Sequence, residues 1–288
     1  MFGNQHFGPT DLIHAHTYTT LEDLSIKEGS CALHRITFLE TPAKHHQHLD
    51  IGCGPGTFTR DFLASRSMPC ATLVAVDQSP LMIDFAKRYR HHDNVTFDVF
   101  DFGGQDVQQL IGKYGCFDRI YSFLWFHFVK DQRKAYADLS KMLAPASGEC
   151  VIFSSVWNIF TDVWLQVHLM ERWRQVIPDP RPLFSLQYKF DFDGQLDKIE
   201  AEVRALVAEA GLETIACHVF QSEWPFPTVE VFVGLIFEAF GFYEAIPEED
   251  IEAVKRDWVR LVQSAATTKS NRFAAKAAFY CVHARARP

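Results

Sequence analysis

Between residues 47 and 154, short apolar runs alternate with longer segments in which apolar residues recur every three or four positions. The short runs predict strands, and the longer segments predict amphipathic helices. We expect five strands here, over residues 47–50, 73–76, 95–100, 119–123 and 150–154. Strands that alternate with helices form a parallel sheet with helices on both faces, so the sequence predicts an α/β fold.

Helices are expected over residues 56–65, after Ser79-Pro80, and over residues 131–143. Serine followed by proline is typical of a helix start, because serine caps free N–H groups and proline fits the first turn.

The alternation ends after Ser155. Residues 157–173 are rich in aromatic side chains and are predicted to be largely helical, until three prolines over residues 178–182 end the segment. We then expect a helix, a strand, another helix and a last strand, over residues 195–210, 213–221, 247–262 and 277–284. No internal repeat or flexible linker is visible, so we expect residues 1–288 to form a single domain.

Three glycines follow the first strand at alternate positions, Gly52, Gly54 and Gly56, shortly after Asp50. Glycine at a strand–helix turn lets the backbone approach a ligand, although an ordinary turn is the other explanation of such a triplet. The second strand ends in Asp77, about 20 residues further on, where a nucleotide-binding βαβ unit carries its ribose-binding acid. An acid before the glycines would repel a pyrophosphate and suits a ligand that carries a cation.

Polar residues lie at the ends of four predicted strands: Asp50, Asp77, Asp101 and Ser122. The carboxyl ends of parallel strands meet at one edge of a sheet, which is where such sheets bind ligands. We therefore expect a binding site at this edge.

The composition narrows the function classes. The chain has 288 residues, 48% of them hydrophobic, and a formal net charge of −8 without a basic cluster, which argues against a nucleic-acid partner. Its seven cysteines lack CxxC spacing, as expected of free thiols in a reducing compartment. We see no signal-peptide pattern and no apolar run of membrane-spanning length, and we expect a cytoplasmic protein.

Histidines are frequent near the start of the chain, at positions 6, 14, 16, 34, 45, 46 and 48. No cysteine or acid stands beside them at a metal-ligand spacing, so we expect no metal site.

Residues 47–156 resemble a class I S-adenosylmethionine-dependent methyltransferase, whose cofactor carries a sulfonium, an ammonium and a ribose. The resemblance implies a Rossmann-like fold with a seven-stranded, mostly parallel sheet whose last strand is antiparallel at the sheet edge. It implies that about 47–156 bind the cofactor and that helical lid segments are inserted at about 157–192 and 224–265. The implied cofactor contacts are Asp50, Gly52, Gly54, Gly56, Asp77, Gln78, Met82, Asp101, Phe102, Ser122 and Phe123.

Residues 117–131, 172–186 and 224–262 are similar to insect juvenile hormone acid methyltransferases, which are themselves similar to farnesoic acid O-methyltransferases. This resemblance implies O-methylation of the carboxylate of a small apolar acid, of the isoprenoid or fatty type. The implied acceptor contacts are His127, Phe128, Trp157 and Trp164.

The chain departs from that family at two points. The family usually has a tryptophan after the histidine, whose indole N–H helps to hold the carboxylate, and here the residue is Phe128, which has no donor. The family also uses a glutamine of an N-terminal helix, which residues 1–45 do not match recognisably. We therefore expect His127 to orient the acceptor oxygen.

Three functions remain open at this point. A carboxylate is ionised near neutral pH and needs no general base, so catalysis would depend on alignment and desolvation. A phenol or another small molecule would need a base, and His127 is the candidate. The third possibility is a relative that binds the cofactor or an apolar ligand without catalysis. The sequence leaves the oligomeric state open.

Overall fold

The computed structural model describes residues 26–184, 196–265 and 273–287. Residues 26–34 form a helix before the first strand. The histidines at positions 6, 14 and 16 lie outside the described residues, as do residues 1–25 of the segment in which an N-terminal glutamine was sought.

The sheet has seven strands in the order β3-β2-β1-β4-β5-β7-β6. Pairing from β3 to β5 is parallel, and β7 is antiparallel to both β5 and β6, which confirms the predicted mostly parallel sheet. The strands are β1 (Gln47–Ile51), β2 (Thr72–Asp77), β3 (Val95–Val99), β4 (Arg119–Phe123), β5 (Glu149–Asn158), β6 (Leu212–Phe226) and β7 (Phe273–Ala286).

The expected place of the last strand was wrong. β7 does not lie at the edge but between β5 and β6, and β6 forms the edge of the sheet. The burial patterns agree, since the middle of β7 is buried without a break while β6 has an exposed or half-buried residue at most positions. A strand covered on both faces reads as a continuous apolar run, as residues 277–282 of β7 do.

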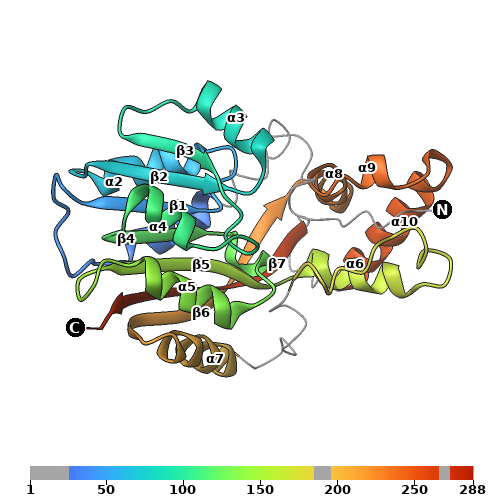
Figure 1. Cartoon of the computed structure of the whole chain (residues 1–288). Helices are drawn as coiled ribbons and strands as arrows, with labels where there is room; N and C mark the ends of the chain where they lie inside the picture. Colours follow the sequence, from blue (N-terminus) through green and yellow to red (C-terminus); the bar gives the residue numbers. More distant parts are fainter. Residues whose placement is uncertain (1–25, 185–195, 266–272, 288) are drawn as a thin grey trace.

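Helices cover both faces of the sheet, as predicted (Figure 1). The helices α4, α5 and α7 pack on one face, while residues 26–34, η2, α2 and α3 pack on the other. Their bounds are η2 (Thr59–Leu63, a π-helix), α2 (Ala64–Ser67), α3 (Pro80–Tyr89), α4 (Gln108–Tyr114), α5 (Gln132–Met142) and α7 (Leu196–Glu209). The expected cap of α3 is present, since the Ser79 hydroxyl accepts from the Met82 N–H at 3.4 Å. The sequence analysis did not predict α4.

The remaining helices gather beyond the carboxyl ends of the parallel strands and form the lid (Figure 1). They are α6 (Ile159–Leu169), α8 (Val229–Ala239), α9 (Phe242–Ala245) and α10 (Glu248–Ala265). The lid has its own hydrophobic cluster, which includes the fully buried rings of Trp164, Phe237 and Trp258.

Two predicted boundaries of the lid differ from the structure. Trp157 belongs to β5, which continues to Asn158 before α6 begins, and Trp224 belongs to β6, which continues to Phe226. Among the described residues, the model contains no helix that combines the length and apolarity needed to cross a membrane.

Candidate active site

The glycine turn after β1 needs glycine for two physical reasons. Gly52 and Gly56 have φ of 74° and 81°, a region that residues with a side chain rarely adopt. A Cβ on Gly52 would lie 2.0 Å from Cγ of Trp125, and a Cβ on Gly56 would lie 2.7 Å from the Phe97 ring. These two glycines therefore let Trp125 and Phe97 pack directly against the backbone of the turn.

Asp77 holds this turn against the start of α3. One carboxylate oxygen accepts from the Gly54 N–H at 3.0 Å, and the other accepts from the Ser79 N–H at 2.8 Å. The residue is 7% exposed, and burial raises the pKa of its carboxyl group despite these two hydrogen bonds. Each oxygen keeps a further lone pair for a ligand hydroxyl.

Asp50 lies at the end of β1 and is 3% exposed. Burial raises the pKa of its carboxyl group to about 7, the Thr59 hydroxyl opposes that rise by donating at 2.6 Å, and the charge of Asp77 adds to it. A cationic ligand group near this carboxyl would stabilise its ionised form.

A cleft of about 620 Å³ lies between the loop after β3 and the start of α5. Asp50, Asp77 and the three glycines are not among the described residues that line it, although Gln78, which follows Asp77, is. Gln78, Asp101, Phe102, Trp125 and Phe128 belong to its walls. The Nε2 of Gln78 is buried and has no hydrogen-bond partner. An orphaned amide donor in a cleft of this volume is what a polar ligand would satisfy.

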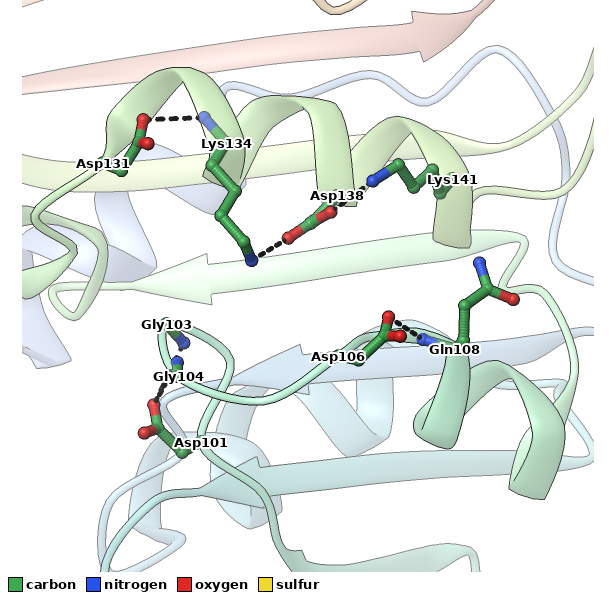
Figure 2. A network of polar contacts seen from close by, with 9 residues as sticks. All are labelled: Asp101, Gly103, Gly104, Asp106, Gln108, Asp131, Lys134, Asp138 and Lys141. Carbon is green, nitrogen blue, oxygen red and sulfur yellow. Dashed lines mark hydrogen bonds and ion pairs between the residues drawn. The ribbon is translucent and has the colours of Figure 1, made fainter.

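Figure 2 shows the loop after β3 opposite α5. The Asp101 carboxylate accepts from the N–H groups of Gly103 and Gly104, each at 3.0 Å, which fixes the loop. Across the cleft, the Lys134 ammonium donates to Asp138 at 2.6 Å and so stays on its own helix.

A second, apolar cavity of about 100 Å³ lies between the sheet and the lid. Its walls are mainly aromatic and aliphatic, with Phe160, Phe184 and Phe240 among them. Phe128 lines both this cavity and the cleft, so the two spaces meet at that ring.

His127 lines the cavity beside Phe128, in the 3₁₀ turn Phe126–Phe128. Its Nδ1 lies 3.4 Å from the Ser154 hydroxyl, and its ring stacks on Phe184 with centroids 6.2 Å apart. Burial lowers the pKa of this imidazole to about 3, so the ring is neutral at neutral pH and is a weak base.

A protein-family model and two kinds of O-methyltransferase match parts of the chain. Residues 49–148 match the family model described as a methyltransferase domain. The chain is 26% identical over 138 residues to juvenile hormone acid O-methyltransferase of Drosophila melanogaster, covering 48% of this chain and 46% of that protein. It is 33% identical over 97 residues to malonyl-[acyl-carrier protein] O-methyltransferase of Hahella chejuensis, covering 34% of this chain and 32% of that protein. The chain thus spans less than half of the length of these curated relatives.

Solved structures share the fold. A Bacillus halodurans protein assigned as a methyltransferase superposes with a TM-score of 0.53 at 14% identity, over 86% of this chain and 95% of that one. Phosphoethanolamine N-methyltransferase 2 of Haemonchus contortus, solved with S-adenosyl-L-methionine, gives a TM-score of 0.50 at 16% identity, over 91% of this chain and 53% of that one. Residues 49–148 carry a methyltransferase domain. This confirms the methyltransferase resemblance stated from residues 47–156.

The residues of this methyltransferase domain fit S-adenosylmethionine. Asp77 has lone pairs for the ribose hydroxyls, and the orphaned Gln78 amide and the ring of Phe102 lie in the cleft wall that would take the adenine. Asp50, with its raised pKa, would be ionised by a nearby cationic group of the ligand. When bound, S-adenosylmethionine would supply an electrophilic methyl group.

Three other predicted cofactor residues, Met82, Ser122 and Phe123, are not among the described residues that line this cleft. The Ser122 hydroxyl is fully buried and donates to the Ile51 carbonyl at 3.0 Å, so it joins β4 to β1. The ring of Phe123 packs against Phe58 with centroids 4.6 Å apart, and Met82 is buried in the first turn of α3.

Trp157 and Trp164, predicted to touch the acceptor, pack within the lid region instead. The Trp157 indole donates to Asp162 at 2.6 Å, and the Trp164 indole donates to the Pro178 carbonyl at 2.8 Å. Neither ring is among the described residues that line the cavity.

Sequence reasoning missed several residues of the site. Trp125 lies against Gly52 and lines the cleft, and Leu124 before it has a φ of 54°, an uncommon conformation for leucine that marks a constrained rim. Asn158 and Trp224 line the cavity from the ends of β5 and β6. In the sequence, polar residues at the ends of predicted strands indicated the site at the carboxyl edge of the sheet. Asn158 is also such a residue, because β5 ends at Asn158 and not at the predicted residue 154.

Among the described residues, no group of three or more histidine, cysteine, aspartate or glutamate side chains is arranged to hold a metal ion.

Proposed function

We propose that this protein is an S-adenosylmethionine-dependent O-methyltransferase that acts on the carboxylate of a small apolar acid. The observation that carries the proposal is the double role of Phe128, whose side chain lines both the cofactor cleft and the apolar cavity. A methyl donor in the cleft and an acceptor in the cavity would therefore meet at this ring. The carboxyl O-methyltransferases that the chain resembles over part of its length support the same class of acceptor.

The chemistry of the cavity favours an acid over a phenol. A phenol needs a general base to form its nucleophilic oxygen, and a neutral, buried His127 with a pKa of about 3 is poorly suited to that task. A carboxylate is already ionised at neutral pH. Lys276 carries the one formal charge among the described residues that line the cavity, and no carboxylate is among them.

The chain's own residues would then bind the cofactor, orient the acceptor and exclude water from it. Asp77 would hold the ribose, the glycine turn would allow the cofactor to approach the backbone, and His127 would orient the acceptor oxygen as a neutral hydrogen-bonding group. The aromatic walls would exclude water, which competes for the carboxylate and so opposes its attack.

The cavity volume of about 100 Å³ is below the range of roughly 300–1,000 Å³ that is typical of ligand pockets. A long-chain acid would therefore have to displace lid side chains as it enters. Phe160 and Phe240 are the candidates, because both line the cavity from the lid and their ring centroids lie 5.2 Å apart.

The experiment that tests the proposal compares matched acceptors with a labelled methyl donor. Acids, alcohols and phenols of equal carbon number are each incubated with the full chain and the cofactor. We expect methyl transfer to acids and little transfer to alcohols or phenols. Preferred transfer to a phenol, or cofactor binding without transfer to any acceptor, would contradict the proposal.

A further inference from the structure

One residue that lines the cavity carries a buried polar atom without a partner in the protein. Trp224 lines the cavity, and its indole Nε1 is buried without a hydrogen-bond partner. The ring stacks on Phe279, with centroids 5.7 Å apart and planes at 29°. A buried N–H without an acceptor has lost its water and gained nothing in exchange, and native proteins keep few such groups.

Other indoles of the lid region show the usual arrangement. The N–H of Trp157, Trp164 and Trp173 donates to an oxygen of Asp162, Pro178 and Asp257, at 2.6, 2.8 and 2.7 Å. The Nε1 of Trp258 is also without a partner, but that ring is fully buried in the lid cluster and is not among the residues that line the cavity. Trp224 therefore combines an unused donor with a place at the cavity.

The position of Trp224 connects the sheet with the lid. It lies near the end of β6, opposite Ala275 of β7, and it packs partly buried against both the sheet-face cluster and the lid cluster. His127 and Phe128 line the same cavity, and Phe128 offers no hydrogen-bond donor. An anionic acceptor in this cavity needs donors, and the Trp224 N–H is one that no group of the protein uses.

We propose that the indole N–H of Trp224 donates a hydrogen bond to one carboxylate oxygen of the acceptor and so makes the cavity selective for acids. This inference rests on the function proposed above and names a specificity-determining residue for it. The bond would satisfy the orphaned donor and one anionic oxygen at once, in a cavity whose other walls are largely apolar.

The test uses the full chain loaded with S-adenosylhomocysteine, with decanoic acid and methyl decanoate as probes. Binding of each probe is measured by calorimetry for the native chain and for Trp224→Phe. A second variant carries 3-benzothienylalanine at position 224, which keeps the ring shape and removes the donor. Trp164→Phe is the control, because it removes an indole N–H whose acceptor lies within the protein.

We expect both changes at position 224 to weaken decanoate binding about tenfold or more and to leave methyl decanoate binding unchanged. The benzothienyl variant should be at least as resistant to heat as the native chain, whereas Trp164→Phe should be less resistant. A merely structural role of Trp224 would not change the preference for acid over ester.

Equal decanoate binding by the native chain and the benzothienyl variant would overturn the role of Trp224. So would a native chain that binds acid and ester equally, or neither. The proposed function is judged separately, by transfer of the methyl group from S-adenosylmethionine to decanoate by the native chain. A chain that transfers the methyl group but loses no acid binding in the variants would contradict the inference alone.

Discussion

At the scale of single residues, two buried carboxyl groups near the glycine turn differ in their hydrogen-bond donors. Asp77 accepts two backbone N–H groups, whereas Asp50 has the Thr59 hydroxyl as its hydrogen-bond donor in the described structure. Both pKa values are raised by burial, and a bound ligand with hydroxyl and cationic groups would offset that cost. The positions of both acids could be predicted, because each directly ends a strand of the motif.

We predict that Asp77→Ala lowers cofactor affinity by about tenfold or more, because it removes charge-assisted hydrogen bonds to the ribose. Calorimetric titration with S-adenosylmethionine measures the effect. Asp106→Ala is the matched control, since Asp106 also accepts a backbone N–H, that of Gln108 at 3.0 Å, but is not among the described residues that line the cleft. Equal affinity of Asp77→Ala and the native chain would show that the ribose binds elsewhere.

The raised pKa of Asp50 predicts a pH-dependent stability. An acid whose pKa is about 7 when folded and near 4 when unfolded favours the folded state less and less as the pH rises through that interval. Asparagine at this position does not titrate. Relative to the native chain, Asp50→Asn should therefore gain free energy of unfolding from about pH 4.5 to about pH 7.5.

Denaturant unfolding of the cofactor-free protein at several pH values measures this difference. The buried His127 titrates in both chains, so its contribution largely cancels in the comparison. Parallel pH profiles of the two chains would show that Asp50 is ionised throughout.

At the scale of elements, the alternation of strands and helices was predictable and the lid boundaries were not. β1 to β4 follow from local apolar runs, whereas β5 and β6 extend to Asn158 and Phe226 because they pair with the long strand β7. That pairing joins segments far apart in the sequence, and no local pattern reports it. The cavity residues Asn158 and Trp224 were missed for the same reason.

A buried acid joins two segments of the lid. Asp257 of α10 is 5% exposed and accepts from the Trp173 indole at 2.7 Å, from Arg260 at 3.0 Å and from Arg172. These contacts tie the segment after α6 to α10.

We predict that Asp257→Ala lowers the free energy of unfolding by about 2–4 kcal/mol, because it leaves a buried indole N–H and two cations without their acceptor. Glu200→Ala, which breaks an exposed pair with Arg204, should cost less than about 1 kcal/mol. Denaturant unfolding measures both, and equal losses would show that Asp257 does not stabilise the lid.

At the scale of the whole molecule, the cleft proposed for the cofactor borders the sheet, and the cavity proposed for the acceptor lies between the sheet and the lid. The two spaces share Phe128, and the hydrophobic clusters of sheet and lid also meet at Phe128 and Trp157. The parallel strands of the sheet follow from the sequence pattern, whereas the place of β7 between β5 and β6 does not. The depth and shape of the cavity depend on how aromatic rings from distant segments pack, and the sequence does not encode this locally.

This arrangement predicts a dependence on the length of the acid. Each additional buried methylene should strengthen binding by about 0.8 kcal/mol, or roughly fourfold, until the lid can yield no further. Dissociation constants for a series of straight-chain acids measure the trend. Affinity that does not change along the series would show that the aromatic rings pack the lid and do not receive the acceptor.

The most direct test of the account asks what bond the transferred methyl group forms. The full chain is incubated with methyl-labelled S-adenosylmethionine and a medium-chain apolar acid, and the product is treated with base. Methyl esters release volatile labelled methanol under these conditions, whereas methyl ethers and methylamines do not. The account predicts base-labile, volatile label that depends on the acid and that decreases in Asp77→Ala when the cofactor is below saturation. Label that stays base-stable, or no label in the product at saturating cofactor and acid, would contradict it.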